Sequence, residues 1–244
     1  MLTPEELQEL ESTVENLYEH GNSENQQEIM ETWFKDIDYF PKTRYIIELS
    51  IPNKSDSKVK LAHFGLRASF LLLQHICPTW SLDDFMEMAK WCRDIFMSQI
   101  ERFISVPLLM QAFCNMYSQL VLYGWHISDG FEIFAQIFNF EPGNKSDITS
   151  KQNQEQFWTQ LLSSSPLQWI GKIRIYTEIV AKMTYIHKLE TKQVKEFKEV
   201  ALYQCFYLGV HTLDLILDKK MPEQYTEDDI FQLIDQSVQL INTC

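Results

Sequence analysis

The sequence predicts an all-α protein in which about five helical hairpins stack side by side to form an α-α superhelix. Apolar residues recur at three- and four-residue intervals along most of the 244 residues, as they do in amphipathic helices. The chain has only seven glycines, which leaves few positions for tight β-hairpins. Successive hairpins are about 40 to 50 residues apart, the period of repeats of the HEAT or armadillo type. Residues 1–244 are therefore predicted to form one solenoid segment.

Three helices are expected in the first fifty residues. Thr3 can cap the first of them, and Pro4 suits its first turn. Pro41 opens the third helix, and Pro52 lies in the break that follows it. The expected ranges are 4–19, 24–37 and 41–49.

The middle of the sequence predicts the clearest hairpin. Ser81 and Asp84 have the spacing of a reciprocal helix cap, and Pro107 suits the start of the next helix. Gly124 and Trp125 close the hairpin. The helices expected here are 57–76, 81–103 and 105–123.

More helices are expected in the second half, after a polar surface loop at 141–156. Gly65, Gly171 and Gly209 fall inside predicted helices, where the missing side chain permits close packing of a neighbouring helix. The helices expected in this half are 128–139, 154–164, 166–187, 190–218 and 226–243.

The charge of the chain indicates which partners it suits. The formal net charge is −13, and residues 1–40 carry eleven Asp or Glu residues against one basic residue, Lys35. This balance disfavours a nucleic-acid surface, which needs clustered Lys and Arg, and also an anionic membrane surface. It suits a basic protein partner that is steered by electrostatic attraction, although solubility alone explains it equally well.

The five cysteines include no CxxC pair, and four of them lie within or beside apolar stretches. Buried, reduced thiols in a cytosolic or nuclear protein are therefore predicted. The N-terminus is acidic and polar, unlike a signal peptide, and no apolar run is long enough for membrane insertion.

The sequence offers no constellation of residues for catalysis. Its six histidines include no HExxH motif and no pair at i and i+4. There is no GxSxG, GxGxxG or P-loop motif either. No catalytic residue, metal site or cofactor is predicted, and the protein is not expected to be an enzyme. A helical enzyme of unknown chemistry stays open as an alternative.

Several segments resemble the N-terminal region of the importin-β (karyopherin) superfamily of nuclear transport receptors. LESTVENLYE at 10–19 is similar to the opening helix LExxxxxLYE of the exportin seven branch, and QQEIMETWF at 26–34 is similar to its partner helix. QAFCNMYSQLVLYGW at 111–125 fits the pattern QALxxxYxxxxxxGW. The likeness is closest to exportin seven and its relatives, Ran-binding proteins sixteen and seventeen, and next to exportin four. Two features depart from the pattern: the insertion-like loop 141–156, and Lys182 where the family usually has an acid.

The resemblance implies an importin-β N-terminal-like part at about 1–125 and further HEAT repeats at 126–244. Receptors of this family bind the GTP form of the small GTPase Ran on their concave surface, mainly through the second helix of each hairpin. They also bind protein cargo and nucleoporins, and they shuttle between nucleus and cytoplasm through the nuclear pore. The chain is therefore expected to be the N-terminal part of an exportin-like receptor.

Candidate Ran-binding residues lie on the faces of the second helices that the apolar stripes leave outward. Any one of them can equally belong to an ordinary solvated face. The candidates are Gln27, Glu31, Lys35, His63, Arg67, Gln74, Gln111, Asn115 and Ser118. A HEAT-repeat scaffold or adaptor unrelated to Ran would share the same pattern and is the main alternative in function. A helical bundle is the alternative in fold.

Overall fold

A computed structural model describes residues 2–21, 39–76, 79–127, 162–184 and 197–244, and these ranges contain helices and no strand. The prediction of an all-α protein is confirmed for them. The helices are α1 (Pro4–His20), α3 (Tyr39–Ser50), α4 (Asp56–Ile76), α5 (Leu82–Ser98), α6 (Ile100–Ser105), α7 (Pro107–Ile127), α11 (Pro166–Thr184), a π-helix (Phe197–Leu202), α13 (Tyr203–Leu217) and α14 (Glu227–Thr243). The helices expected at 24–37 and 128–139, the loop at 141–156 and nearly all of 154–164 lie outside the described residues.

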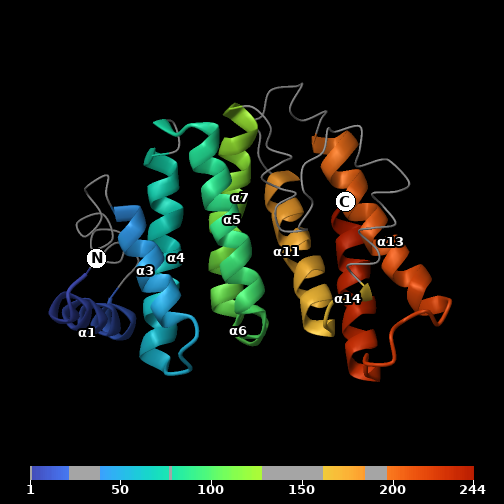
Figure 1. Cartoon of the computed structure of the whole chain (residues 1–244), viewed down its shortest axis with the longest axis horizontal. Helices are drawn as coiled ribbons and strands as arrows, with labels where there is room; N and C mark the ends of the chain where they lie inside the picture. Colours follow the sequence, from blue (N-terminus) through green and yellow to red (C-terminus); the bar gives the residue numbers. More distant parts are fainter. Residues whose placement is uncertain (1, 22–38, 77–78, 128–161, 185–196) are drawn as a thin grey trace.

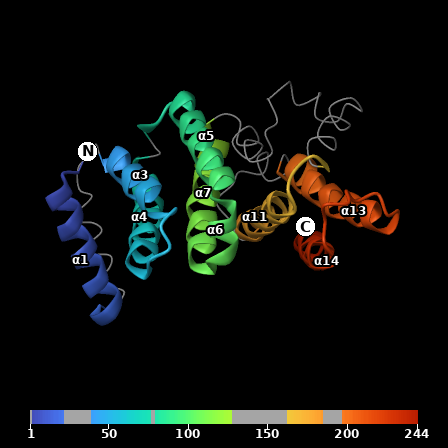
Figure 2. The same ribbon diagram turned by 60° about the horizontal axis from the view of Figure 1, so that its bottom comes forward.

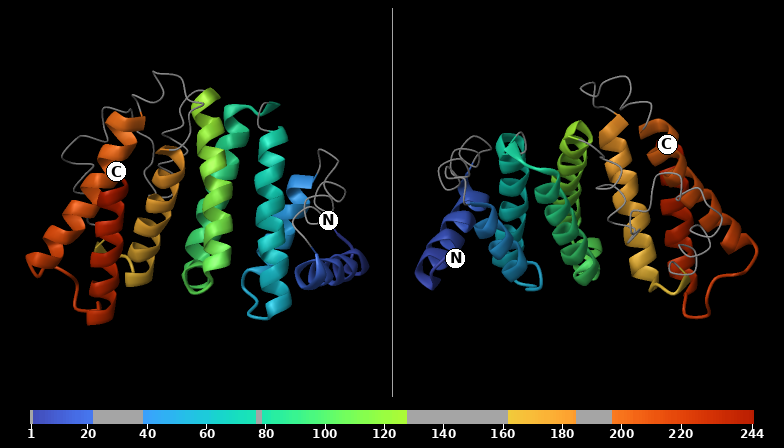
Figure 3. Two further views of the ribbon diagram at one scale, coloured as in Figure 1. Left: turned by 180° about the vertical axis from the view of Figure 1, so that it is seen from behind. Right: turned by 45° about the horizontal axis from the view of Figure 1, so that its top comes forward.

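The helices stand side by side in the order of the chain, from α1 at one end to α13 and α14 at the other (Figure 1). They form two layers, which Figure 2 separates by tilting the stack. One layer contains α3, α5 and α13. The other contains α4, α7, α11 and α14, which form the continuous row seen from behind in Figure 3. In this row α7 packs on α4, α11 on α7, and α14 on α11.

Three helices begin with reciprocal caps that the sequence encodes locally. The Ser81 hydroxyl accepts the backbone N–H of Asp84 at 3.3 Å, and the Asp84 carboxylate accepts the backbone N–H of Ser81 at 2.8 Å. This confirms the cap predicted from the spacing of these two residues. α1 and α14 start in the same way, with Thr3 and Thr226 as caps. Each cap satisfies backbone donors that the first turn leaves unpaired.

The main core extends from α3 to α14 without interruption. At its centre the rings of Phe96, Phe103 and Phe113 join α5, α6 and α7, with ring centroids 4.9 to 5.4 Å apart. A smaller cluster of buried side chains holds α1 against α3 and α4, and it includes Leu10 and Phe64. The interior is therefore an elongated core with a separate N-terminal cluster.

One predicted helix, 81–103, is wrong as a single element. The chain leaves helical geometry at Gln99, where φ is −122° and ψ is 25°, so α5 ends at Ser98 and α6 begins at Ile100. The break brings Phe103 against both Phe96 and Phe113. Sequence spacing hides it because apolar residues keep their three- and four-residue intervals across Gln99.

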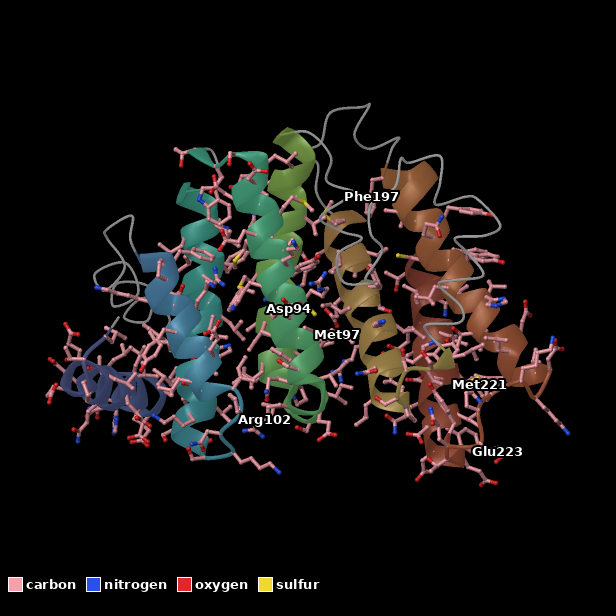
Figure 4. The ribbon with its side chains drawn as sticks, in the orientation of Figure 1. Asp94, Met97, Arg102, Phe197, Met221 and Glu223 are labelled. Atoms are coloured by element: carbon pink, nitrogen blue, oxygen red, sulfur yellow. The ribbon has the colours of Figure 1, made fainter. Side chains whose placement is uncertain are left out.

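The helix predicted at 190–218 also differs from the structure. Within the expected range 190–218, a π-helix at Phe197–Leu202 leads into α13, and residues 190–196 lie outside the described part. In the middle of the stack, Arg102 of α6 reaches the turn between α3 and α4 (Figure 4). Its Nη2 donates to the carbonyl of Asn53 at 3.1 Å, which ties α6 to the preceding helical pair.

Gly65, Gly171 and Gly209 lie close to a neighbouring helix, as predicted, whereas Gly124 lies inside α7 and does not end that helix. A Cβ on Gly171 would lie 2.6 Å from Cδ1 of Ile100, and one on Gly209 would lie 2.7 Å from Cγ1 of Ile241. The corresponding neighbour of Gly65 is Ile47, at 2.9 Å. These distances are too short for a side chain at any of the three positions without a shift of the neighbour.

Candidate protein-binding surface

An open cavity of about 350 Å³ lies between α4 and α7, two adjacent members of the continuous row. It collects four of the nine predicted site residues: His63, Arg67, Gln111 and Asn115. The other described residues that line it are Phe70, Leu71, Leu108 and Ala112. The predicted residues of two different helices therefore share one concavity.

Helical periodicity brings these side chains together. His63 and Arg67 are one turn apart on α4, and Gln111 and Asn115 are one turn apart on α7. α4 and α7 pack against each other along the row, so the two polar pairs face across the seam.

Arg67 gives the cavity its charge. It is the one basic side chain among the described lining residues other than the histidine, and these include no carboxylate. Arg67 as a whole is half-buried. Its positive charge acts on the wall of the cavity. Burial raises the pKa of Tyr18 to about 12, and the charge of Arg67 opposes this rise. The amides of Gln111 and Asn115 add neutral donors and acceptors beside this cation. The cavity is thus suited to a polar or anionic group.

The prediction that His63 faces outward is wrong. Only 9% of its surface is exposed, because α1 covers it. The Tyr18 hydroxyl and Nδ1 of His63 form a hydrogen bond, and the two rings meet edge to face with centroids 5.6 Å apart. Burial, aided by the charge of Arg67, lowers the pKa of His63 to about 4, so the ring is neutral at pH 7. His63 is part of the cavity wall and not a freely accessible contact.

The prediction that Ser118 faces outward is also wrong. Its side chain is 4% exposed, and its hydroxyl donates to the carbonyl of Cys114 at 2.6 Å, one turn earlier in α7. The reason is that α7 has neighbours on several sides, namely α4, α5, α6 and α11. These neighbours cover the second half of α7, including Leu122, which is 7% exposed. Gln119 and Tyr123, further along α7, are half-buried like Asn115, so Ser118 lies off the accessible face of the helix.

Of the four remaining candidates, the structure describes one. Gln74 is exposed at the far end of α4. Its backbone carbonyl accepts a hydrogen bond from the Tyr123 hydroxyl at 3.4 Å. It lies beyond the lining of the cavity. Gln27, Glu31 and Lys35 lie outside the described residues.

The sequence pattern did not predict the apolar residues at the rim of the cavity. Leu108 is 42% exposed, and Phe70 and Leu71 are half-buried beside the polar pairs. Leu108 lies three residues before Gln111, so the helical interval that selected Gln111 also marked Leu108. Lys172 of α11 is not among the lining residues of this cavity. It is 6% exposed, and burial lowers its pKa to about 8.

Other kinds of site have little support in the part of the chain that the structure describes. No group of three or more His, Cys, Asp or Glu side chains there is placed to hold a metal ion. Cys92, Cys114 and Cys205 are buried, and burial raises the pKa of each thiol, whereas Cys244 is exposed. None of the described helices is long and apolar enough to cross a membrane.

Comparison with known proteins adds no relative to this picture. No family model matches the chain, and no curated protein or solved structure matches it either.

Proposed function

We propose that this chain is the N-terminal part of an exportin-like nuclear transport receptor, and that it binds the GTP form of Ran. The proposal takes the two-layer stack as a HEAT-type solenoid. The observation that carries it is the α4/α7 cavity, which joins Arg67, Gln111 and Asn115 on the row of second helices. The sequence resemblance independently assigns Ran binding to the second helices.

The action would be one of binding and not of catalysis. A GTPase bound along the row contacts several helical pairs at once. Small rotations between these pairs add up along the stack, so occupancy of one site changes the shape of a distant one. Affinity for Ran and affinity for protein cargo are then linked by a coupling free energy. Nucleoporin binding and movement between nucleus and cytoplasm belong to the same proposal.

The test is a pull-down with the purified chain on beads and Ran loaded with either GTP or GDP. We expect retention of the GTP form and loss of the GDP form. Equal retention of both forms, or of neither, contradicts the proposal. Equal retention with an intact fold would favour a HEAT-type scaffold unrelated to the nucleotide state of Ran.

The cavity itself is tested by charge reversal. Arg67→Glu places a carboxylate where we expect an anionic group of Ran, and it should weaken binding at least about tenfold. The matched control is Arg93→Glu, which makes the same change on α5, in the opposite layer. The double substitution Gln111→Ala and Asn115→Ala tests the other wall without a change of charge. Unchanged binding in both cavity variants would show that Ran binds elsewhere.

A further inference from the structure

α1 is attached to the fold by a small set of contacts of its own. Its buried side chains, Leu10, Val14 and Leu17, belong to the N-terminal cluster and not to the main core. The helix lies at one end of the stack, across the direction of α3 and α4 (Figure 1). Because the main core includes no residue of α1, this helix can leave while the main core stays packed.

Two ion pairs add to the apolar contacts of α1. Glu11 pairs with Lys58 at 2.6 Å, and Glu19 lies 3.8 Å from Lys60, both near the start of α4. All four side chains keep some contact with solvent, so the pairs add little to the attachment. The attachment of α1 therefore depends mainly on its three buried apolar side chains and on Tyr18.

Tyr18 joins α1 to the α4/α7 cavity. Its hydroxyl forms a hydrogen bond with Nδ1 of His63, and its ring meets the imidazole edge to face, so that His63 is only 9% exposed. His63 also lines the cavity. Departure of α1 would therefore expose this imidazole to water at one wall of the cavity.

We propose that α1 is a detachable helix that sets the charge of the α4/α7 cavity. While α1 is docked, His63 is neutral at pH 7 and the positive charge of the cavity comes from Arg67. When α1 leaves, the solvated imidazole takes up a proton as the pH falls, and the cavity gains a second positive charge one turn from the first. Two charges attract an anionic group more strongly than one. This part rests on the proposed function, because it regulates the same site.

The ionisation of His63 supports this mechanism. Burial, together with the charge of Arg67, lowers its pKa to about 4. From α1 it faces Tyr18, whose pKa burial raises to about 12, and the lining residues of α7 that share the cavity are uncharged. α3 also packs on α4 but contributes no charge that acts on His63.

The linkage between proton and helix has a definite sign. Departure of α1 removes burial from His63, so its pKa returns towards the ordinary value of 6.5. The released state therefore binds the proton more tightly than the docked state. Lowering the pH from 7 to 5 should increase the ratio of released to docked α1 about ten- to twentyfold.

Loss of the ion pair between Glu11 and Lys58 does not account for such a change. Burial raises the pKa of Glu11, but hydrogen bonds from Lys58 and Ser57 outweigh it and hold the pKa below its usual value. Glu11 is therefore still ionised at pH 5, which leaves His63 as the group that responds.

The first test is hydrogen exchange of the full chain at pH 7 and pH 5, read at the amides of α1 and α7 and corrected for the intrinsic rate. At pH 7 we expect weaker protection in α1 than in α7, because α1 opens without the main core. At pH 5 the protection of α1 should fall about ten- to twentyfold. His63→Gln should abolish this fall, whereas His20→Gln, at the exposed end of α1, should keep it. Equal protection of α1 and α7 at pH 7, or a fall that survives His63→Gln, overturns the proposal.

The second test follows the proton itself by NMR. The ring signal of His63, identified by its absence in His63→Gln, should titrate near pH 4 in the unaltered chain. Leu10→Ser combined with Val14→Ser removes two apolar contacts of α1 without adding a charge, and the ring should then titrate near about pH 6. The control Gln8→Ser combined with Asn16→Ser changes the exposed side of the same helix and should leave the titration near pH 4.

The variant with both apolar contacts removed decides between the outcomes. Titration of His63 near pH 4 in this variant overturns the proposal, and so does a loss of protection in α7, because α1 would then not be separable from the main core. Both tests use the chain alone. A failed pull-down of Ran would therefore contradict the proposed function and leave the detachable helix in place.

Discussion

At the scale of single residues, His63 is the clearest case of a polar side chain whose role depends on its neighbours. The sequence places it on the outer face of a helix, and α1 then covers it through Tyr18. A buried imidazole that keeps a hydrogen bond costs little while neutral, but it resists protonation strongly. The cavity is thus lined by a group that is uncharged at neutral pH.

This residue makes the stability of the fold depend on pH. The unfolded chain binds the proton of His63 near pH 6.5, whereas the folded chain binds it only near pH 4. The free energy of unfolding is therefore highest above pH 6.5, and His63 lowers it by about 2 kcal/mol between pH 7 and pH 4.5. Urea unfolding at the two pH values measures the difference. His63→Gln should reduce it, whereas His20→Gln, at an exposed position on α1, should not. An equal pH dependence in all three proteins contradicts the assignment.

At the scale of elements, periodicity predicted most of the helices and did not predict what covers them. The starts of α1, α5 and α14 follow from local caps that can be read directly in the sequence. The outward placement of Ser118 failed because it depends on how many helices pack around α7, and that is a property of the tertiary fold. At Gln99 the apolar intervals continue across a break in the backbone. The sequence pattern therefore does not reveal that the predicted helix is two helices.

The cap of α14 should have a measurable effect on stability. Thr226→Ala removes the hydroxyl that accepts the backbone N–H of Asp229 at 3.2 Å. We expect a loss of about 1 kcal/mol in the free energy of unfolding, because a first-turn donor loses its partner. Thr226→Ser keeps the hydroxyl and should restore most of the loss. Denaturant unfolding compares the three proteins, and an unaltered midpoint for Thr226→Ala would count against this role.

Close packing between α13 and α14 gives a second prediction at this scale. Gly209→Ala places a methyl group 2.7 Å from Cγ1 of Ile241 and 3.1 Å from the backbone carbonyl of Ser237. The rigid carbonyl cannot move aside, so we expect a net loss of about 1 to 2 kcal/mol, despite the better helix propensity of alanine. Gly65→Ala contacts only side-chain atoms of Ile46 and Ile47 and should cost less. The order of the two thermal midpoints checks this, and the reverse order contradicts it.

At the scale of the whole molecule, α11 joins the two ends of the stack. It packs on α6 and α7 on one side and on α13 and α14 on the other. Gly171 lies on the first of these sides, with Ile100 and Ile104 of α6 close to its Cα. A side chain at this position would therefore meet α6, on the side of α11 that packs on the N-terminal helices.

A bulky side chain at this junction should separate the two ends. Gly171→Leu forces α11 away from α6, and unfolding should change from one cooperative transition to two. Calorimetry and circular dichroism together detect the second transition. Lys90→Leu, at an exposed site on α5, is the control that should keep a single transition. One unbroken transition in Gly171→Leu would mean that the ends are held together by other contacts.

The row formed by α4, α7, α11 and α14 also has a mechanical consequence. Its members meet in series, so a load applied between the two ends is carried by one seam after another. Each seam yields through a small rotation of one helix on the next, and the extensions add while the force stays the same. We expect such a row to bend more readily along its length than across it, because rotations at the seams add only in the direction of the stack.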